Sequence, residues 1–550
     1  MARGLKERYT DFLYSFTFDN ISQLDQDVST ASAAIREWRN TFVPINRVPL
    51  DILSLIPAHL ASQKDRFRAS FVCRHWRRTF LQRATLWSEL YLSMGEAYVK
   101  TLLGRAKGSM LDIFAGHTKS LGYVVDLRSH TKQIGYLDFS YHYWKNIQRF
   151  SEVNSGPFPL LHTLRIDAVS EFDLNGPDVM TPPSLPLFST AVNLKDFLLY
   201  SEGSPFINHF VFPKLTTFQL SAVPEEEEFH ASQLLDFLEA SPMLRTVHMK
   251  VIGDILLQGI PRERVVVLPD VETFSLVVSE GGPGYEVATH ISCPSVRNMT
   301  LIHDKVAHDA LPEEIFPALI SWNTIARQYA RAPIEEVALE INLFNDPLIT
   351  CSVTFRSPDA TVLRLVFKVA ASDDDEDEED QMNFLDVHYG AFSQASRTIR
   401  NHPHLASVKR LCIHHRAILS HSDQLTRTAN EVGLLFKSMG PLEELSLEYC
   451  DIQAYLRPLL SSQEHHDMEQ HAVFPPVKEF RITHPSMAHN SRGACMETIV
   501  EFAKSRHELG VPFERLTICM ERLPAAMAEK LGPWVGVVDC YEEIKVDFDP

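Results

Sequence analysis

The sequence predicts an α/β protein in which an N-terminal helical unit is followed by a long α/β solenoid of repeated strands. Two observations predict this class. Residues 45–92 carry apolar side chains at the three- and four-residue spacing of short helices. From residue 151 onward an apolar residue is repeatedly followed, three and five positions later, by two more, which is typical of stacked strands. The expected domains are a helical arm (1–44), the helical unit (45–92), a linker or first irregular repeats (93–150) and the solenoid (151–550).

The helical unit combines several short amphipathic helices. Pro49 suits the first turn of a helix, where its missing N–H costs nothing. Pro57 is expected to kink or end the first helix. The apolar faces are formed by Ile52, Leu53, Ile56 and Leu60, then by Ala69, Val72, Cys73, Trp76 and Phe80, with Leu86 and Trp87 closing the unit. So small a unit cannot bury all of this surface within itself, and the surplus predicts a docking module.

Three ordered motifs in this unit resemble an F-box. They are Val48-Pro49-Leu50-Asp51-Ile52-Leu53, Val72-Cys73-Arg74-His75-Trp76 and Leu86-Trp87. The alternative is an unrelated helical bundle. The resemblance implies that the unit docks on the Skp-type adaptor of a cullin ligase core and leaves the choice of target to the rest of the chain. The residues it implies for adaptor binding are Pro49, Ile52, Leu53, Ile56, Leu60, Val72, Cys73, Trp76, Leu86 and Trp87.

Charge is unevenly distributed along the chain. Residues 64–83 hold seven basic side chains and one acid, Asp65, and such a patch steers an acidic partner toward itself. Nucleic acid is the competing partner, but the whole chain has a net charge of −19. We therefore expect no nucleic-acid binding.

The arm ahead of the helical unit shows a heptad pattern over three heptads. Its apolar positions are Ile21, Leu24, Val28, Ala31, Ile35, Trp38 and Phe42. One interpretation is a coiled-coil arm that dimerises the protein; the other is a single helix lying on the helical unit or on the next domain.

The strand motif recurs eleven times. Its copies span 161–166, 194–199, 215–220, 244–249, 271–276, 296–301, 334–339, 408–413, 442–447, 477–482 and 513–518. The spacing resembles that of an irregular leucine-rich repeat, and an F-box followed by such repeats is a familiar architecture of ubiquitin-ligase substrate receptors. A generic α/β domain with similar strands is the alternative.

The repeat is interrupted near 349–383. Alternating apolar residues over 349–355 and 363–369, separated by Ser357-Pro358-Asp359, predict a hairpin. Eight consecutive acids at 373–380 predict a loop, which either captures a basic target or is simply solvated.

Residues between the inward apolar positions of each strand are expected on the opposite face of the sheet. In the early strands those singled out are neutral, such as Thr217, Gln219 and Ser275. In the later strands they are charged: Glu336, Glu340, Arg410, His414, Glu444, Glu448, Glu479, Arg481 and Arg515. Fixed charges of both signs discriminate between partners, so these nine residues are the predicted target-binding set.

Several classes of function lack support in the sequence. No apolar run is long enough to cross a membrane, and no phosphate-binding, zinc-protease or serine-hydrolase motif occurs. The eight cysteines are scattered singly, and the histidine clusters lack metal-ligand spacing. We expect no catalytic site, no metal and no cofactor, in a reducing cytoplasmic or nuclear setting.

Two functions remain open. The chain is either the substrate-recognition subunit of an SCF-type E3 ubiquitin ligase or a scaffold that recruits a partner without ubiquitylation. The identity of the partner protein is not encoded in any recognisable motif.

Overall fold

The computed structural model divides the chain into two compact units. Unit 1 comprises residues 1–141 and 149–161, and unit 2 comprises residues 142–148 and 162–550. The structure describes residues 18–60, 62–115, 126–169, 190–202, 207, 210–223, 229–252, 255–256, 259–261, 263–279, 286–306, 333–342, 348–358, 362–370, 392–393, 395–416, 422–450, 452–461, 475–483, 492–520 and 526–542.

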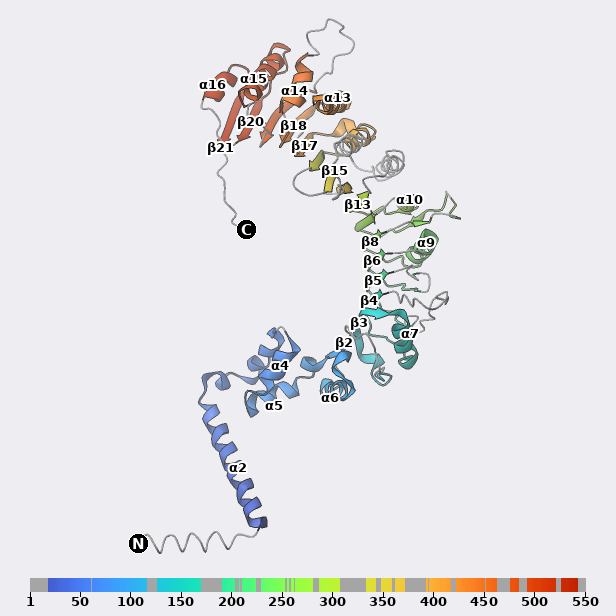
Figure 1. The fold of residues 1–550 in the computed structure, drawn as a ribbon, viewed down its shortest axis with the longest axis vertical. Coiled ribbons are helices and arrows are strands. Elements are labelled where there is room, and N and C mark those ends of the chain that lie inside the picture. Colours follow the sequence, from blue (N-terminus) through green and yellow to red (C-terminus); the bar gives the residue numbers. More distant parts are fainter. Residues whose placement is uncertain are drawn as a thin grey trace, which may run out of the picture. The chain divides into compact units, whose positions relative to one another are not determined.

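Unit 1 is mainly helical and also contains strands β1 and β2 and most of β3 (Figure 1). Its helices are α2 (Phe18–Thr41), η1 (Pro44–Arg47), α3 (Leu50–Leu53), η2 (Ile56–His59), α4 (Gln63–Ser70), α5 (Arg74–Gln82), η3 (Ala84–Trp87), η4 (Leu92–Met94), α6 (Glu96–Ala106) and η5 (Thr131–Gln133). Its strands β1 (Glu89–Tyr91), β2 (Leu111–Phe114) and β3 (Ile134–Tyr143) pair in parallel in that order. The helix α7 (Trp144–Val153) follows β3.

Local sequence explains the boundaries of the first helices. The α-helical conformation ends at Leu53, and Pro57 lies in the first turn of the following 3₁₀ helix, as its locked φ favours. Ser62 caps α4, because its hydroxyl accepts a hydrogen bond from the Asp65 backbone N–H at 3.1 Å. The same hydroxyl donates to the Asp65 carboxylate at 2.7 Å, and this bond lowers the pKa of Asp65.

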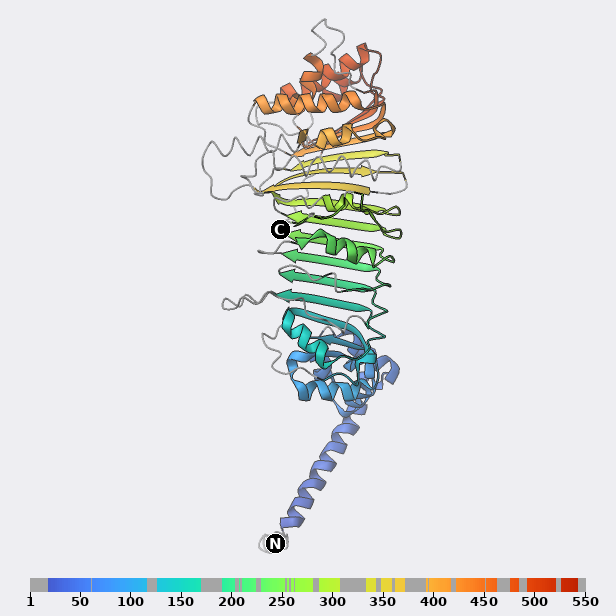
Figure 2. The same ribbon diagram turned by 90° about the vertical axis from the view of Figure 1, so that its right-hand side faces the viewer.

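Unit 2 is built on one large sheet whose strands are stacked one above another (Figures 1 and 2). The strands are β4 (Thr163–Val169), β5 (Asp196–Glu202), β6 (Thr217–Val223), β8 (Thr246–Ile252), β11 (Thr273–Ser279), β13 (Asn298–Val306), β14 (Glu336–Asn342), β15 (Leu348–Arg356), β16 (Val362–Ala370), β17 (Arg410–Arg416), β18 (Leu442–Glu448), β19 (Val477–Thr483), β20 (Arg515–Met520) and β21 (Val537–Glu542). Short strands β7 (Phe229–His230), β9 (Ile255–Leu256), β10 (Val266–Val267) and β12 (Ile291–Ser292) form two separate pairs.

Helices cover one face of this sheet. They are α9 (Ala231–Glu239), α10 (Glu286–Thr289), α13 (Ser422–Ser438), α14 (Ile452–Ser461), α15 (Arg492–Glu508) and α16 (Ala526–Leu531), with η7 (Leu405–Ser407) before β17. The rings of Phe218 on β6 and Phe237 on α9 lie 4.5 Å apart, and those of Phe480 on β19 and Phe502 on α15 lie 6.1 Å apart. Apolar strand residues therefore point toward the helices, and the residues between them occupy the face that no described helix covers.

All eleven copies of the strand motif coincide with strands, at β4, β5, β6, β8, β11, β13, β14, β17, β18, β19 and β20. Residues at equivalent motif positions are paired across neighbouring strands; Phe197, Phe218 and Val247 are one example. A one-residue slip would move the whole apolar set to the other face, so burial of this set fixes the register.

The expected hairpin is formed by β15 and β16, which pair antiparallel from Leu348 with Ala370 to Arg356 with Val362. These strands do not protrude from the sheet. Instead β16 lies beside β13, β14 lies beside β17, and β15 runs antiparallel between β16 and β14. The motif copy at β14 is therefore separated from the copy at β13 by both hairpin strands. The acidic run at 373–380 lies outside the described residues.

The predicted arm forms one helix, α2, but its apolar residues are not covered. Ile35 is 59% exposed and Trp38 is 64% exposed. The expectation that the helix would lie with this face against the helical unit does not hold for the described residues.

The stability of unit 2 should depend on pH through His402. This side chain is 5% exposed, its ring stacks on Phe355 at 5.0 Å, and its Nδ1 accepts a hydrogen bond from the His404 backbone N–H at 3.2 Å. Burial, with a smaller effect of His404, lowers the pKa of His402 from 6.5 to about 4. Between these values the unfolded chain binds the proton and the folded chain does not, so the free energy of unfolding falls as the pH falls.

We expect His402→Asn, which keeps a hydrogen-bond acceptor but does not titrate, to lose less thermal stability than the wild type between pH 7 and pH 5. Thermal unfolding followed by circular dichroism measures this difference. His230→Asn, at an exposed position of the same unit, is the control. If His402→Asn kept the pH dependence of the wild type, His402 would not be the cause of the loss of stability at low pH.

Candidate functional site

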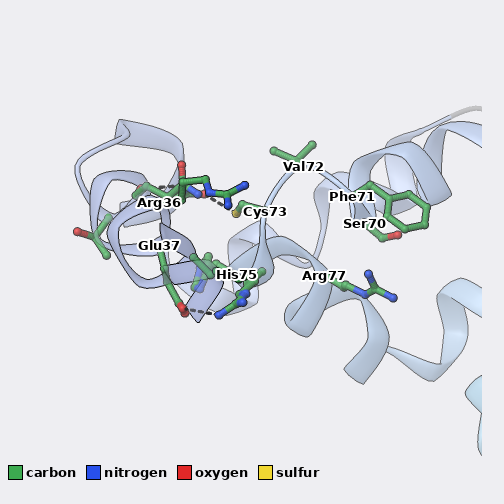
Figure 3. Close-up of a pocket in the computed structure, with 14 residues that line it drawn as sticks. Arg36, Glu37, Ser70, Phe71, Val72, Cys73, His75 and Arg77 are labelled. Carbon is green, nitrogen blue, oxygen red and sulfur yellow. Dashed lines mark hydrogen bonds and ion pairs between the residues drawn. The ribbon is translucent and has the colours of Figure 1, made fainter. Parts of the chain in front are cut away.

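Unit 1 exposes apolar side chains in two short segments. Leu50, Ile52 and Leu55 in and after α3 are 55%, 49% and 50% exposed. Phe71 and Val72, on the turn between α4 and α5, are 67% and 62% exposed (Figure 3). Two clustered segments of exposed large apolar residues are typical of a surface that a partner covers.

The ten residues implied for adaptor binding divide into three groups by exposure. Pro49, Ile52 and Val72 are exposed; Ile56, Leu60, Cys73 and Trp76 are half-buried; and Leu53, Leu86 and Trp87 are buried. The first group is accessible to a partner in this structure. The third group instead belongs to the core of unit 1.

Trp87 shows the structural role of the buried group. Its indole N–H donates to the Phe80 carbonyl at 3.0 Å, and its ring lies 5.1 Å from that of Phe67. The Arg105 guanidinium lies 4.9 Å from the centroid of the Trp87 ring and 5.8 Å from that of Phe67. A cation over a buried indole adds to the packing of this side chain.

Trp76 joins the F-box-like segment to the chain ahead of it. Its indole N–H donates to the Asn46 side-chain oxygen at 2.8 Å, and the Asn46 amide donates to the Asn40 carbonyl of α2 at 2.8 Å. Asn46 is not among the residues that the sequence patterns predict to be functional. No local pattern marks it, because its role depends on a contact 30 positions away in the chain.

The basic side chains of this region are partly paired. Arg66 lies 2.7 Å from Glu89, Arg68 lies 3.2 Å from Asp65, and Arg74 lies 3.3 Å from Glu37 of α2. Arg83 donates to the Ser54 hydroxyl. Lys64, Arg77 and Arg78 are exposed and have no carboxylate partner among the described residues, so they are the charges left to attract an acidic partner.

A second candidate surface lies on the uncovered face of the sheet in unit 2. We call its nine residues the charge ladder: Glu336, Glu340, Arg410, His414, Glu444, Glu448, Glu479, Arg481 and Arg515. Across the parallel strands they form two rows, Glu336–Arg410–Glu444–Glu479–Arg515 and Glu340–His414–Glu448. Arg481 lies between these two rows. All nine are half-buried or exposed.

Members of the charge ladder are paired with each other and with their neighbours. Arg481 lies 3.5 Å from Glu444, and Arg515 lies 3.5 Å from Glu479. Further pairs join Arg410 to Glu336 at 3.7 Å, Glu336 to Arg356, Glu340 to Arg364 at 3.4 Å, and His414 to Glu448 at 3.6 Å. The surface therefore presents charges of both signs that are largely compensated by their neighbours.

The His414 contact has an electrostatic effect on its partner. Its hydrogen bond lowers the pKa of Glu448, and the Ser446 hydroxyl, which donates at 3.3 Å, acts in the same direction. Glu448 therefore stays ionised at neutral pH.

A groove crosses the same face over β4, β5, β6, β8 and β11. Its lining includes Arg165, Tyr200, Gln219, His248 and Lys250. Arg165, His248 and Lys250 form no ion pair among the described residues, unlike the members of the charge ladder. The expectation that the early strands present mostly neutral side chains was therefore incomplete, although the same alternation rule places these three residues on this face.

In the described part of the chain, no group of three or more histidine, cysteine, aspartate or glutamate side chains is placed to hold a metal ion. His415 is buried and bonded through Nδ1 to the Tyr455 hydroxyl at 2.5 Å. The histidines at 465, 466 and 471 lie outside the described residues. Within the segments that the structure describes, no helix is both long and apolar enough to span a bilayer.

The first of these surfaces lies in a segment that matches a known family. The model of the F-box-like family matches residues 45–93, which contain both exposed apolar segments. The chain thus carries an F-box-like domain, and this domain is consistent with an adaptor-binding role in SCF ligases. No curated protein matches the chain.

The exposed and buried groups predict different consequences of mutation. Trp87→Ala should lower the free energy of unfolding of unit 1 by about 3–5 kcal/mol, as removal of a buried indole does. Ile52→Ala should change it by less than about 1 kcal/mol, because the side chain is half in solvent. Hydrogen exchange of α4 and α6 during denaturant titration measures both. Equal destabilisation by the two variants would show that Ile52 is a core residue.

Proposed function

We propose that this chain is the substrate-recognition subunit of an SCF-type E3 ubiquitin ligase. The F-box-like domain docks a Skp-type adaptor, and unit 2 holds a target protein. The observation that carries the proposal is the family match over 45–93 to a segment whose apolar side chains lie in solvent at Ile52 and Val72. In this role the chain brings the target to the conjugating enzyme and performs no chemistry itself.

The proposed adaptor surface consists of the exposed group, Pro49, Ile52 and Val72, and the half-buried group at its side. Burial of exposed apolar side chains favours association by about 25 cal/mol per Å², from which the lost translational, rotational and side-chain freedom is subtracted. Cys73 and Trp76 lie at the start of α5 next to Val72, so an adaptor that covers Val72 also meets them. Leu53, Leu86 and Trp87 support the surface from within the core.

Ile52→Asp combined with Val72→Asp should abolish capture of the adaptor. Each change places a carboxylate where the complex needs apolar burial, and central interface residues typically contribute about 2 kcal/mol or more. Pull-down with purified adaptor measures the loss.

Met94→Asp combined with Met110→Asp is the matched control. These side chains are 52% and 48% exposed in the same unit, and the variant adds the same two charges. Retained adaptor capture by the Ile52/Val72 variant would exclude the proposed docking surface.

For unit 2 we infer an irregular leucine-rich-repeat-like solenoid. The inference is supported by the repeated strand motif, by parallel pairing of equivalent motif positions and by helices on one face only among the described elements. Such an arrangement leaves one long sheet face for binding.

The charge ladder is the proposed target surface within residues 334–520. Fixed charges of both signs on a rigid sheet favour a partner of complementary pattern and penalise like charges in the wrong place. Binding of a target there exchanges the internal ion pairs for intermolecular ones, so affinity depends on the match of the charge pattern.

Glu444→Lys combined with Glu448→Lys should weaken target capture while adaptor capture stays unchanged. The ladder pairs are partly exposed, so their loss should cost the fold only about 0–1 kcal/mol each. The measurement is the set of proteins that copurify from cells with the variant and with the wild type, together with the half-lives of those proteins after deletion of the chain.

His248→Glu combined with Lys250→Glu is the comparison variant, because it adds two negative charges in the groove and leaves the ladder intact. If only this variant loses the target, the target lies over β4 to β11 and the proposed placement is wrong. If captured proteins keep their half-lives after deletion, the chain is a scaffold rather than a substrate receptor.

A further inference from the structure

The apolar side of α2 is an unused surface of unit 1. Its large residues are between 47% and 64% exposed: Ile21, Leu24, Val28, Ile35, Trp38 and Phe42. Together with Ala31 they occupy the first and fourth positions of three consecutive heptads and, at Phe42, the first position of the next. This spacing places the six residues within α2 on one side of the helix, and Phe42 directly follows its last residue. We call these seven residues the α2 seam.

The opposite side of α2 already has a partner within unit 1. Glu37 pairs with Arg74 of α5 at 3.3 Å, and the Asn40 carbonyl accepts from Asn46 at 2.8 Å. Ser29 and Ala33 lie on the same side and line a crevice with Cys73. Because this polar side is held toward α5, the α2 seam faces away from the helices of the F-box-like domain.

A second copy of the same chain fits the α2 seam when the two helices run antiparallel. In the register where facing residue numbers sum to 66, Leu24 meets Phe42 of the second copy, Val28 meets Trp38, and Ala31 meets Ile35. Each layer then combines a smaller and a larger side chain, as close packing of a coiled coil needs. The overlap from Leu24 to Phe42 is about 27 Å long at 1.5 Å per residue.

Charge favours the same arrangement. In this register Asp25 lies beside Arg39 of the second copy, and two-fold symmetry makes the contact twice. A parallel pair would instead stack Ala31 on Ala31 and Trp38 on Trp38, and would bring Asp25 and Asp27 of both helices together without forming any opposite-charge pair. Asp25 and Arg39 are both exposed in the structure, so they are available for the contact in the antiparallel pair.

We propose that the α2 seam is a homodimerisation surface and that two copies of the chain associate through an antiparallel coiled coil of their α2 helices. The dimer carries two F-box-like domains, each attached to its α2 by the polar side of the helix.

The mass of the full chain in solution tests the association. We expect light scattering at tens of micromolar to give about twice the monomer mass of 62.5 kDa. Val28→Glu combined with Ile35→Glu should give the monomer mass with unchanged adaptor capture. Gln26→Glu combined with Thr30→Glu, which adds the same charge outside the seam, should remain dimeric. A wild-type chain that is monomeric, including one whose seam is covered by another part of the same molecule, overturns the proposal.

Two further variants test the orientation. Asp25→Arg should raise the dimer dissociation constant about tenfold, because it replaces two attractions with two repulsions, and Asp25→Arg combined with Arg39→Asp should restore it. In a parallel dimer the double variant would give no rescue.

Disulfide crosslinking gives an independent readout of orientation. A mixture of Leu24→Cys and Phe42→Cys chains should form a mixed disulfide on oxidation, whereas Leu24→Cys alone should not, since the two Leu24 positions lie about 27 Å apart. Crosslinking of Leu24→Cys to itself would show a parallel pair and overturn the proposed arrangement.

Discussion

One continuous buried row of apolar side chains sets the architecture of unit 2. Register pairs Phe218 with Val247 and, further along the sheet, Leu445 with Phe480, and the row continues through the hairpin strands at Phe355. Every strand must present its apolar residues to the same side because the helices cover only that side. The other face is therefore committed to polar residues along its whole length. The charge ladder and the groove are two outcomes of that single constraint. The ladder has compensated charges, and the groove has basic side chains without an ion-pair partner in the described part of the chain.

In unit 1 the apolar side chains are divided between the core and the surface. It is too small to bury all the apolar side chains of its helices, so part of them supports the core and part remains in solvent. Trp87 and Leu53 are fully buried, whereas Ile52 and Val72 are about half exposed or more. The division matters for function, because the buried residues shape the turn and short helix on which the exposed ones are presented. Mutations of the two groups would both impair docking, but through different physical causes.

Much of the strand layout could be predicted from the sequence, because a two-residue alternation repeated eleven times leaves little freedom in which side chains point inward. The end of the first α-helix ahead of Pro57 followed equally from backbone geometry, although the helix ends at Leu53, four residues earlier. The order of β14, β15 and β16 could not be predicted, since adjacency of β16 to β13 depends on long-range pairing that no local pattern records. Asn46 was missed for the same reason. Exposure within the F-box-like segment also escaped prediction: a helical face shows which residues share a side, not which of them the rest of the unit covers.

The reversal of direction at β15 has a consequence for how unit 2 comes apart. In a repeat array each element is stabilised mainly by its immediate neighbours, so cooperativity passes along the stack from one element to the next. At β14 to β16 the neighbours along the stack are in reverse chain order, and β16 reaches β13 only after the intervening chain has closed a long loop. Cooperative folding should therefore pass less readily from the block β4–β13 to the block β17–β21 than from strand to strand within either block. Mechanical pulling from the two ends of unit 2 should unfold the two blocks in separate steps, with strands β14, β15 and β16 lying between the blocks.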